Sequence, residues 1–265
     1  MDKVASFLQS DAWGEVQEAY GRPVQRVNGV LAIRHKWYWF IPHGPLVDGL
    51  ADGALFVRYE PDTAPLYDRR VPDVHPSKTL LTPLTAPDQM LSSMKQKCRY
   101  NIHVAEKKQL QVIDHLSADR FFDVLVKTGV RQKIKLHAKR YYDTMITVLK
   151  KYDMVKVYGV EYQQEIIAVA LVVYYQGTVT YLHGGSDYDH RSLMAPYLLH
   201  WQILQDAQAQ KNTYYDWFGL SERWPGVTKF KLGFGGEVVT RPGTFEHPLR
   251  PLWYTGYRMM KTLWI

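Results

Sequence analysis

Lys231 is the residue of this chain best suited, by its type and its neighbours, to act on a polar group. It lies in the segment from Tyr214 to Gly236, which reads YYDWFGLSERWPGVTKFKLGFGG. Phe230 and Phe234 flank it, and apolar surroundings strengthen the field of an ammonium group. The segment ends on glycines, which let a ligand or another strand come close. A strand with a glycine bulge and a lysine that reaches solvent explains the same residues equally well.

The length and charge of the chain limit the classes of protein to which it can belong. With 265 residues, 46% of them hydrophobic, it can bury one large core or two modest ones, which argues against disorder. The formal net charge of +7 favours a polyanionic partner: a nucleic acid, a phosphorylated metabolite or an anionic membrane. A solvated basic surface without a specific partner fits this charge as well.

Cysteine content and apolar runs indicate the compartment. Cys98 is the single cysteine of the sequence, which rules out an internal disulfide and fits a reducing compartment. The first residues lack the apolar core of a signal peptide. The longest apolar run, Ile166 to Tyr175, is about half of the roughly 20 residues that a membrane-spanning helix needs. We therefore expect a soluble protein of the cytoplasm.

Apolar periodicity and turn signals predict the order of helices and strands. Helical spacing is found over residues 6–20, 88–107, 119–127, 138–151 and 193–209. Strand-like runs cover residues 24–34, 37–41, 54–59, 79–84, 155–161, 166–175 and 178–183, and the Lys231 segment begins with another. Residues 60–76, which are rich in Pro and Asp, are expected to form a loop.

The second half of this order is that of a GNAT-type acyltransferase domain: two helices, three strands, a helix and a strand. Such enzymes usually hold the pyrophosphate of acetyl-coenzyme A on a glycine-rich loop before the helix that follows the third strand. The corresponding segment, Asp187 to Pro196, contains no glycine. This argues against coenzyme A as the donor, and the sequence also lacks nucleotide-binding glycine motifs and clustered Cys and His ligands.

Several stretches, in order over nearly the whole chain, resemble the FemABX peptidoglycan bridge-forming aminoacyltransferases. The stretches are FLQSDAWGEVQEAYGR near the start, FIPHGPL from Phe40, VRYEP from Val57, MKQKCRYNIHVAEKK from Met94, TGVRQKIKLHAKRYY from Thr128, YLHGGS from Tyr181, RSLMAPYLLHW from Arg191, and YDWFG with GVTKFKLGFGG around Lys231.

This resemblance implies an α+β fold with two tandem GNAT-like domains, a cleft between them and no long coiled-coil arm. The first domain, which would bind the precursor, is expected over residues 1–107 and 243–265, because the end of the chain returns to complete it. The second domain is expected over residues 108–242 and would hold the aminoacyl-tRNA end and the catalytic lysine.

The resemblance also implies a reaction and its partners. An amino acid would move from aminoacyl-tRNA to the side-chain amine on the stem peptide of a peptidoglycan precursor, either UDP-MurNAc-pentapeptide or a lipid-linked muropeptide. Members of the family need no metal or organic cofactor, so we expect none, and we expect a monomer. Residues 95–108 and 257–264 offer cationic surface for tRNA or for the inner face of the membrane. The latter stretch also fits a helix packed on the protein.

The resemblance assigns three residues to the reaction centre. Lys231 looks like the family's lysine that faces the aminoacyl end, where one oxyanion partner is worth about 2.7 to 4 kcal/mol. Phe230 would present a backbone carbonyl or a stacking face to the tRNA terminus. Glu60, in VRYEP, matches an acidic residue that orients or deprotonates the acceptor amine. An exposed glutamate at a strand end is the alternative for Glu60.

Four further residues are candidates for phosphate and precursor binding. His137 and Tyr141 are one helical turn apart and are expected to share a face toward the precursor diphosphate. His137 stands where the family often has an arginine. Gln17 stands where some members have a phosphate-binding lysine, and Arg22 is expected to compensate.

Tyr181 and His183 alternate along one strand, so both are expected to project from the same side. By resemblance that side faces the substrate cleft, whereas a histidine bonded to a backbone carbonyl in the core is the ordinary alternative. His43, in FIPHGPL, and Arg191, in RSLMAPYLLHW, complete the predicted substrate-binding residues.

Two other functions remain open from the sequence. One is a GNAT-like N-acyltransferase that uses another acyl donor and another amine. The other is a basic RNA-binding protein without catalytic activity.

Overall fold

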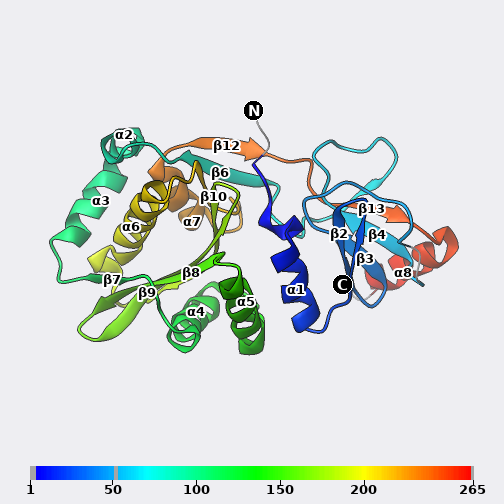
Figure 1. The fold of residues 1–265 in the computed structure, drawn as a ribbon, viewed down its shortest axis with the longest axis horizontal. Helices are drawn as coiled ribbons and strands as arrows, with labels where there is room; N and C mark the ends of the chain where they lie inside the picture. The colour runs from blue at the N-terminus through cyan, green and yellow to red at the C-terminus, as the bar shows by residue number, and fades with distance from the viewer. Residues whose placement is uncertain (1–3, 51–52, 264–265) are drawn as a thin grey trace. The chain divides into compact units, whose positions relative to one another are not determined.

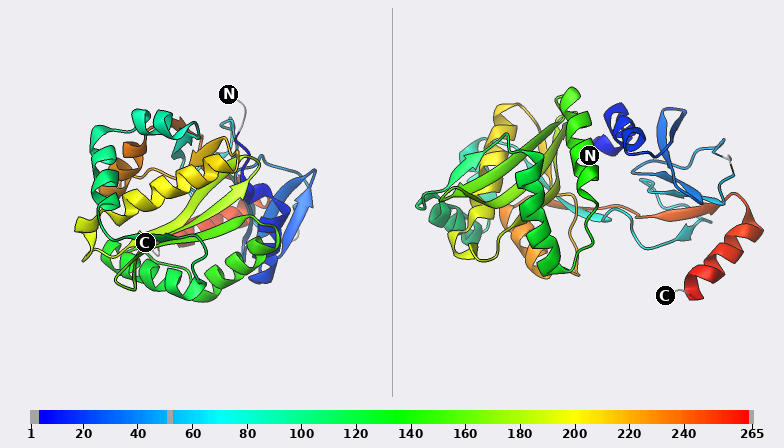
Figure 2. Two further views of the ribbon diagram at one scale, coloured as in Figure 1. Left: turned by 60° about the vertical axis from the view of Figure 1, so that its left-hand side comes forward. Right: turned by 90° about the horizontal axis from the view of Figure 1, so that it is seen from below.

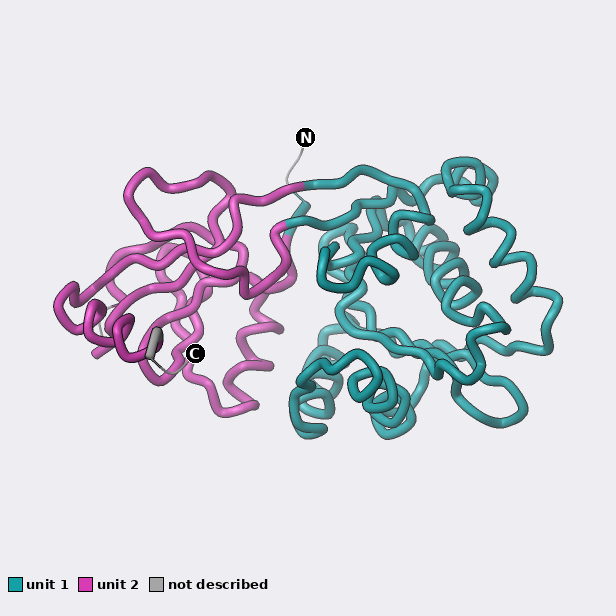
Figure 3. Tube along the Cα trace, turned by 180° about the vertical axis from the view of Figure 1, so that it is seen from behind, with its two compact units in different colours: residues 1–5, 78–239 teal, residues 6–77, 240–265 magenta. Residues whose placement is uncertain are grey.

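The computed structural model describes residues 4–50 and 53–263, with the elements labelled in Figure 1 and seen from two further sides in Figure 2. The chain forms two compact units (Figure 3). Unit 1 consists of residues 1–5 and 78–239, and unit 2 consists of residues 6–77 and 240–265. The last part of the chain thus belongs to the same unit as residues 6–77.

Unit 2 is built on a six-stranded mixed sheet with the strand order β1-β2-β3-β4-β13-β5. The hairpin between β1 and β2 turns at Asn28 and Gly29, which both have positive φ, as a tight turn of this type requires. Strand β13 pairs antiparallel with both β4 and β5, so the last part of the chain completes this sheet. The elements are η1 (Phe7–Gln9), α1 (Asp11–Ala19), β1 (Val24–Val27), β2 (Val30–Arg34), β3 (Tyr38–Ile41), β4 (Phe56–Tyr59), β5 (Arg69–Arg70), β13 (Phe245–Pro248) and α8 (Pro251–Leu263).

Unit 1 is built on a seven-stranded sheet with the strand order β12-β6-β11-β10-β9-β8-β7. Strands β10 and β11 run parallel, and β8, β9 and β10 form an antiparallel meander. The elements are β6 (Lys78–Pro83), α2 (Pro87–Ser93), α3 (Gln96–Glu106), β7 (Gln111–Ile113), α4 (Ala118–Gln132), α5 (Lys139–Lys151), β8 (Val155–Tyr162), β9 (Glu165–Tyr175), β10 (Thr178–Ser186), η2 (Arg191–Leu193), α6 (Ala195–Ala209), β11 (Tyr214–Asp216), α7 (Pro225–Lys231), η3 (Leu232–Phe234) and β12 (Glu237–Thr240).

Helices cover both faces of the unit 1 sheet. Helix α6 packs with α3 and lies over β8 and β9 on one face, whereas α4 and α5 lie on the other face (Figures 1 and 2). Residues of β9 are buried almost without interruption, because a strand covered on both sides must be apolar on both sides. The fold class is therefore mixed α+β, as predicted.

The boundaries of the two units differ from the predicted domains. Residues 78–107, which were expected in the first domain, pack in unit 1. Strand β6 pairs with β11 in the sheet of unit 1, and Leu80, Met94 and Ile102 lie in the core that the unit 1 strands share. The second boundary lies at residue 239 rather than at residue 242.

The helix predicted over residues 88–107 is two helices. Met94 and Lys95 adopt extended ψ angles of 150° and 144° and separate α2 from α3. The break lets the backbone N–H of Lys95 donate to the carbonyl of Gly233 at 2.9 Å. A contact distant in sequence therefore overrides the local helical pattern.

No helix in the described part of the chain is longer than 15 residues, and none is long and apolar enough to cross a membrane. A coiled-coil arm is accordingly not found among these residues, in agreement with the prediction.

Candidate active site

Lys231 is the last residue of helix α7. Its Nζ donates hydrogen bonds to the backbone carbonyl of Trp217, at 2.8 Å, and to that of Gly219, at 2.7 Å. Because an ammonium group has three N–H donors, these contacts leave one donor for a ligand, as far as the described residues show. The lysine is thus held at a fixed position and does not extend into solvent from a strand.

The turn after β11 presents these two carbonyls to the lysine. Asp216 Oδ1 accepts hydrogen bonds from Phe218 N, at 2.9 Å, and from Thr79 Oγ1. Thr79 Oγ1 in turn accepts one from Gly219 N at 3.2 Å. Phe218 has a φ of 49°, a left-handed conformation that is uncommon for a bulky residue. A turn held in this conformation by a buried aspartate is the kind of local strain that concentrates at functional sites.

Aromatic rings surround the ammonium group. Lys231 Nζ lies 5.4 Å from the ring centroid of Tyr181, within cation–π range. The His200 ring lies 4.5 Å from Tyr181 and 4.7 Å from Trp217, and its Nδ1 is 2.9 Å from the hydroxyl of Tyr215. These contacts join α6, β10 and β11 into an aromatic cluster around one cation.

The pKa values of Lys231 and His200 are both lowered by their apolar surroundings. Burial lowers the pKa of the Lys231 ammonium to about 8, and the charge of Asp216 opposes this effect. Burial and the charge of Lys231 lower the pKa of His200 to about 3, so this imidazole is neutral at pH 7. A charged donor held in such surroundings can stabilise an oxyanion as it develops.

Phe230 belongs to the same aromatic cluster. Its ring centroid lies 5.5 Å from that of His200 and 6.0 Å from that of Trp217. Its backbone carbonyl accepts the N–H of Leu232 at the end of α7. The ring forms part of the apolar wall.

The glycines after Lys231 are explained by backbone packing. Gly235 has a φ of 77°, and a Cβ there would lie 2.6 Å from the carbonyl oxygen of Ser93. Gly236 has a φ of 128°, and a Cβ there would lie 2.3 Å from the carbonyl oxygen of Leu81. Both glycines let the chain pass close to the end of α2 and to β6.

His200 and Asp216 are not among the site residues predicted from the sequence. His200 is only 2% exposed and stands three residues after Tyr197, on the apolar side of α6. A polar residue inside an apolar helical row was the signal that could have identified it.

The prediction that Tyr181 and His183 share one side of their strand is wrong. Tyr181 pairs with Val172 of β9 and His183 pairs with the next residue, Leu171, so Leu182 forms a bulge. Because neighbouring residues of a strand point to opposite faces, the bulge places the two side chains on opposite faces. Tyr181 contacts His200 of α6, whereas His183 contacts Tyr142 of α5, with ring centroids 5.2 Å apart.

His137 and Tyr141 lie together, as expected, with ring centroids 4.3 Å apart. His137 belongs to the loop before α5, however, and is not on the helix itself. Tyr142 connects this pair to His183, whose pKa burial and the charge of His137 lower to about 3. The four rings form a group on the α5 face of the sheet, the face opposite Tyr181.

Arg191 is exposed in η2. Its guanidinium lies 4.4 Å from the ring centroid of Tyr188, and Nη1 donates to the Tyr188 carbonyl at 3.2 Å. None of these contacts joins Arg191 to the Lys231 cluster.

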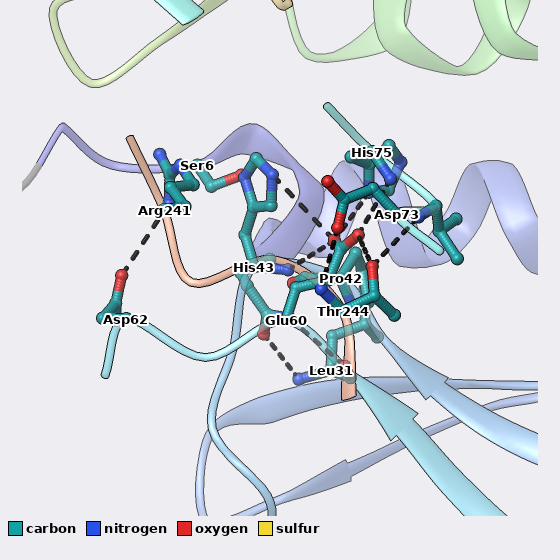
Figure 4. A network of polar contacts seen from close by, with 12 residues as sticks. Ser6, Leu31, Pro42, His43, Glu60, Asp62, Asp73, His75, Arg241 and Thr244 are labelled. Carbon is teal, nitrogen blue, oxygen red and sulfur yellow. Dashed lines mark hydrogen bonds and ion pairs between the residues drawn. The ribbon is translucent and has the colours of Figure 1, made fainter. Parts of the chain in front are cut away.

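Glu60, in unit 2, lies just after β4 and is the centre of a polar network (Figure 4). Its Oε1 accepts hydrogen bonds from His75 N, at 2.9 Å, and from Thr244 Oγ1, at 3.1 Å. Its Oε2 accepts one from His43 N, at 3.3 Å, and lies 2.7 Å from His75 Nδ1. Glu60 is 6% exposed, so the alternative of an exposed glutamate does not apply.

The surroundings of Glu60 and His43 lower the pKa values of both side chains. Burial favours the neutral carboxyl of Glu60, but His75 outweighs this effect and lowers the pKa of Glu60 to about 2. Burial and the charge of Arg241 lower the pKa of His43 to about 3. A carboxylate with this pKa is a poor proton acceptor at pH 7, so the arrangement suits orientation better than deprotonation.

Gln17 and Arg22 are joined, also in unit 2. Gln17 is 1% exposed in α1, and its Oε1 accepts a hydrogen bond from Arg22 Nη1 at 2.8 Å. Gln17 thus positions the guanidinium and does not itself reach a ligand. Arg22 lines an open cavity of 470 Å³, together with Gly21, Pro23, Arg34, His35 and Lys36.

This cavity is strongly basic, since three cationic side chains and no acidic one line it. Burial and the charge of Arg22 lower the pKa of His35 to about 4, so the imidazole contributes no positive charge at pH 7. Of the three cations, only Arg22 is predicted from the sequence. Arg34 is the last residue of β2, and Lys36 lies in the loop that follows this strand.

Comparison with known proteins points to one family. Residues 148–262, a stretch that includes Lys231, match the model of the FemAB family. The aminoacyltransferase FemA of Staphylococcus epidermidis is 29% identical over 91 residues, which are 32% of this chain and 22% of FemA. The aminoacyltransferase FemB of the same species is 30% identical over 98 residues, 34% of this chain and 24% of FemB. The matches thus cover about a quarter or less of these relatives' length.

Solved structures show that the fold is shared more widely. A structure of FemX superposes with a TM-score of 0.79 at 14% identity, over 95% of this chain and 94% of that one. The C-terminal domain of a putative lysylphosphatidylglycerol synthetase from Agrobacterium fabrum superposes with a TM-score of 0.62 at 13% identity, over 89% and 87% of the two chains.

Proposed function

We propose that this chain is a FemABX-family protein and that it transfers an amino acid from aminoacyl-tRNA to an amine of a peptidoglycan precursor. The observation that carries this proposal is the ammonium of Lys231, bound to two carbonyls within an aromatic cluster and left with one donor. The similarity to proteins named aminoacyltransferases supports the reaction class.

The chemistry is the aminolysis of an ester. The amine of the precursor attacks the ester carbonyl, a C–N bond forms and the C–O bond to the tRNA ribose breaks. The proton released by the amine ends on the ribose hydroxyl that leaves. Lys231 stabilises the negative charge that the carbonyl oxygen carries in the tetrahedral intermediate. The apolar cluster strengthens this interaction by excluding water.

The donor is tested by supplying the protein with a labelled amino acid on tRNA or with labelled acetyl-coenzyme A. Label in the muropeptide from the charged tRNA alone supports the proposal. Label from acetyl-coenzyme A would support an N-acyltransferase of GNAT type, and RNA binding without any product would support a non-catalytic RNA-binding protein.

We further propose that the basic cavity of unit 2 holds the diphosphate of the precursor. A volume of 470 Å³ is in the range of small-molecule sites. Arg22, Arg34 and Lys36 offer the charge-assisted donors that phosphate oxygens prefer. Glu60, in the same unit, would orient the acceptor amine through its network.

Replacing Arg22 with alanine is expected to weaken binding of UDP-MurNAc-pentapeptide by about 10-fold or more, because a hydrogen bond to a charged group is worth about 1.5–3 kcal/mol. Calorimetric titration measures this, and added salt should reduce the difference between variant and wild type. Arg69→Ala, which removes an exposed cation of β5, is the matched control. Equal losses in the two variants would contradict the assignment of the cavity.

Helix α8 is the part of unit 2 that we propose to contact a membrane. Tyr254 packs inward and donates to Glu246 Oε2 at 2.8 Å. On the other side of the helix four apolar residues are 60–89% exposed: Leu252, Trp253, Met259 and Met260. Residues 249–265 include three cations and no acidic residue. An exposed apolar face with cations beside it suits an anionic lipid surface, and a lipid-linked acceptor would be found there.

Sedimentation with vesicles that contain phosphatidylglycerol checks this contact. We expect Trp253→Glu to lower the bound fraction several-fold, whereas Val130→Glu, at a residue of unit 1 that is 76% exposed, should leave it unchanged. Equal sedimentation of all three proteins would contradict the proposal.

We further propose that the enzyme acts in the cytoplasm, where aminoacyl-tRNA is found, and that it is a monomer.

A further inference from the structure

We propose that His43, Glu60 and His75 form a binding site in unit 2 for a divalent transition-metal ion of the zinc class. Each of the three side chains offers one donor atom, and these atoms lie within 4.8 Å of one another. His75 Nδ1 is 2.7 Å and His43 Nε2 is 4.0 Å from Glu60 Oε2. Figure 4 shows both histidine rings beside the carboxylate, from different segments of the chain.

The donor set selects the class of ion. Two imidazole nitrogens and one carboxylate oxygen form a set found in zinc enzymes, in which the fourth position holds water or a substrate. Magnesium and calcium prefer oxygen ligands, so they are not expected to bind here. Zinc–nitrogen and zinc–oxygen bonds are about 2.0–2.2 Å long, so ligand atoms on one tetrahedral ion lie about 3.3 Å apart. His43 Nε2 would therefore move closer to Glu60 Oε2, and His75 Nδ1 would move slightly away from it.

The atoms that would not bind the ion already have partners. His43 Nδ1 lies 2.9 Å from Ser6 Oγ, so its ring presents Nε2 toward Glu60. Thr244 Oγ1 donates to Glu60 Oε1 at 3.1 Å, and Thr244 N donates to Asp73 Oδ1 at 3.1 Å. Such contacts of the ligands' other atoms fix ring and carboxylate orientation in metal sites, and their loss typically weakens metal binding 10- to 100-fold.

The backbone holds the donors on fixed elements. Glu60 follows β4 directly, and the N–H of His75 bonds to it at 2.9 Å. His43 has a φ of 45°, an uncommon left-handed conformation for a histidine. The side chains of His43 and Glu60 are only 8% and 5% exposed, and that of His75 is 20% exposed. An ion would therefore approach from the side of His75.

Binding requires one rearrangement of a proton. The proton between His75 Nδ1 and Glu60 Oε2 must leave so that both atoms can bind the ion, and His75 Nε2 can carry it instead. The charge of Arg241 lowers the pKa of His43. Asp62 Oδ1 lies 3.8 Å from Arg241 Nη1 and offsets this charge.

Zinc is the probe for the test, and neither donor nor acceptor substrate is needed, so the outcome is independent of the proposed transfer reaction. The full chain is stripped with a chelator and titrated with zinc against a chromophoric competitor. We expect one zinc ion per chain, an increase in the midpoint of thermal unfolding with zinc, and no effect of magnesium.

Variants separate this site from adventitious binding. His75→Gln keeps a hydrogen-bond donor beside Glu60 and should lower zinc affinity at least 100-fold, and Ser6→Ala should lower it 10- to 100-fold. The matched control is His247→Ala, because His247 Nδ1 also lies 2.9 Å from a carboxylate, that of Asp68, but the described residues offer this pair no third ligand. Zinc binding that is absent, or that is equally strong in His75→Gln, would overturn the proposal.

Discussion

Replacing Lys231 with methionine is expected to lower the rate of aminoacyl transfer about 100- to 1,000-fold, the loss that follows removal of one oxyanion donor. Methionine keeps the length and apolar character of the side chain, so the packing against Tyr181 should persist. The ammonium that donates to Trp217 and Gly219 would be gone, and with it the positive charge at the ester. Single-turnover transfer from charged tRNA measures the loss.

Lys229→Met is the matched control, because Lys229 is an exposed lysine of the same helix. It should transfer at nearly the rate of the wild type. Circular dichroism should show that both variants are folded, and the unfolding midpoint should fall only in Lys231→Met, which leaves the carbonyls of Trp217 and Gly219 without this donor. A Lys231→Met protein that folds and keeps near-normal turnover would remove Lys231 from the mechanism.

The pH dependence gives a second readout of the same lysine. The acceptor amine must lose a proton to react, so transfer should first accelerate as pH rises. Because burial lowers the pKa of Lys231 to about 8, its charge disappears above this pH, and the wild-type profile should bend downward there. The residual activity of Lys231→Met should lack this bend, and identical profiles in both proteins would contradict the role of a cation.

Replacing Arg58 with methionine is expected to destabilise unit 2 by about 3–5 kcal/mol, the cost of removing one partner of a buried ion pair. Arg58 Nε donates to Glu246 Oε1 at 3.0 Å, and Glu246 is fully buried. Without Arg58, its carboxylate would keep the hydroxyl of Tyr254 at 2.8 Å and Arg258 at 3.5 Å. The free energy of unfolding in urea measures the loss.

A surface pair provides the control for this prediction. Arg26 Nη2 lies 2.7 Å from Asp11 Oδ1, and the side chain of Asp11 is 84% exposed. Arg26→Met removes this pair and two exposed hydrogen bonds to the carbonyls of Gln9 and Gly29, and should cost less than Arg58→Met. Adding Glu246→Gln to Arg58→Met should restore part of the lost stability, because it removes a buried charge that has lost its nearest cation. Equal stability of Arg58→Met and Arg26→Met would show that the buried pair contributes no more than the surface pair.

The sequence predicted best those elements whose burial repeats along the chain. The helix expected over residues 138–151 is α5 (Lys139–Lys151), and the strand expected over 166–175 is β9 (Glu165–Tyr175). The one-sided apolar pattern of α5 and the continuous apolar run of β9 are visible without tertiary structure. Pro225 starts α7 as a first-turn proline does, yet the glycines after Lys231 favoured a strand there.

The site was predictable only where its residues share a local segment. Lys231 and Phe230 are neighbours in the chain, and the carbonyls of Trp217 and Gly219 lie in the same segment. The network of Glu60 could not be predicted, because residues 60–76 have no periodicity and Thr244 is 184 residues away. The bulge at Leu182 contains no glycine or proline, so nothing local indicated that Tyr181 and His183 would face opposite sides.

The mass of the precursor after reaction tests the central claim most directly. Wild-type protein, tRNA charged with a mixture of amino acids, and either UDP-MurNAc-pentapeptide or the lipid-linked muropeptide would be incubated and the acceptor analysed by mass spectrometry. We predict an acceptor heavier by one aminoacyl residue, formed only with charged tRNA and strongly reduced with Lys231→Met. Unmodified acceptor in every combination of charged tRNA and precursor would contradict the proposed aminoacyl transfer.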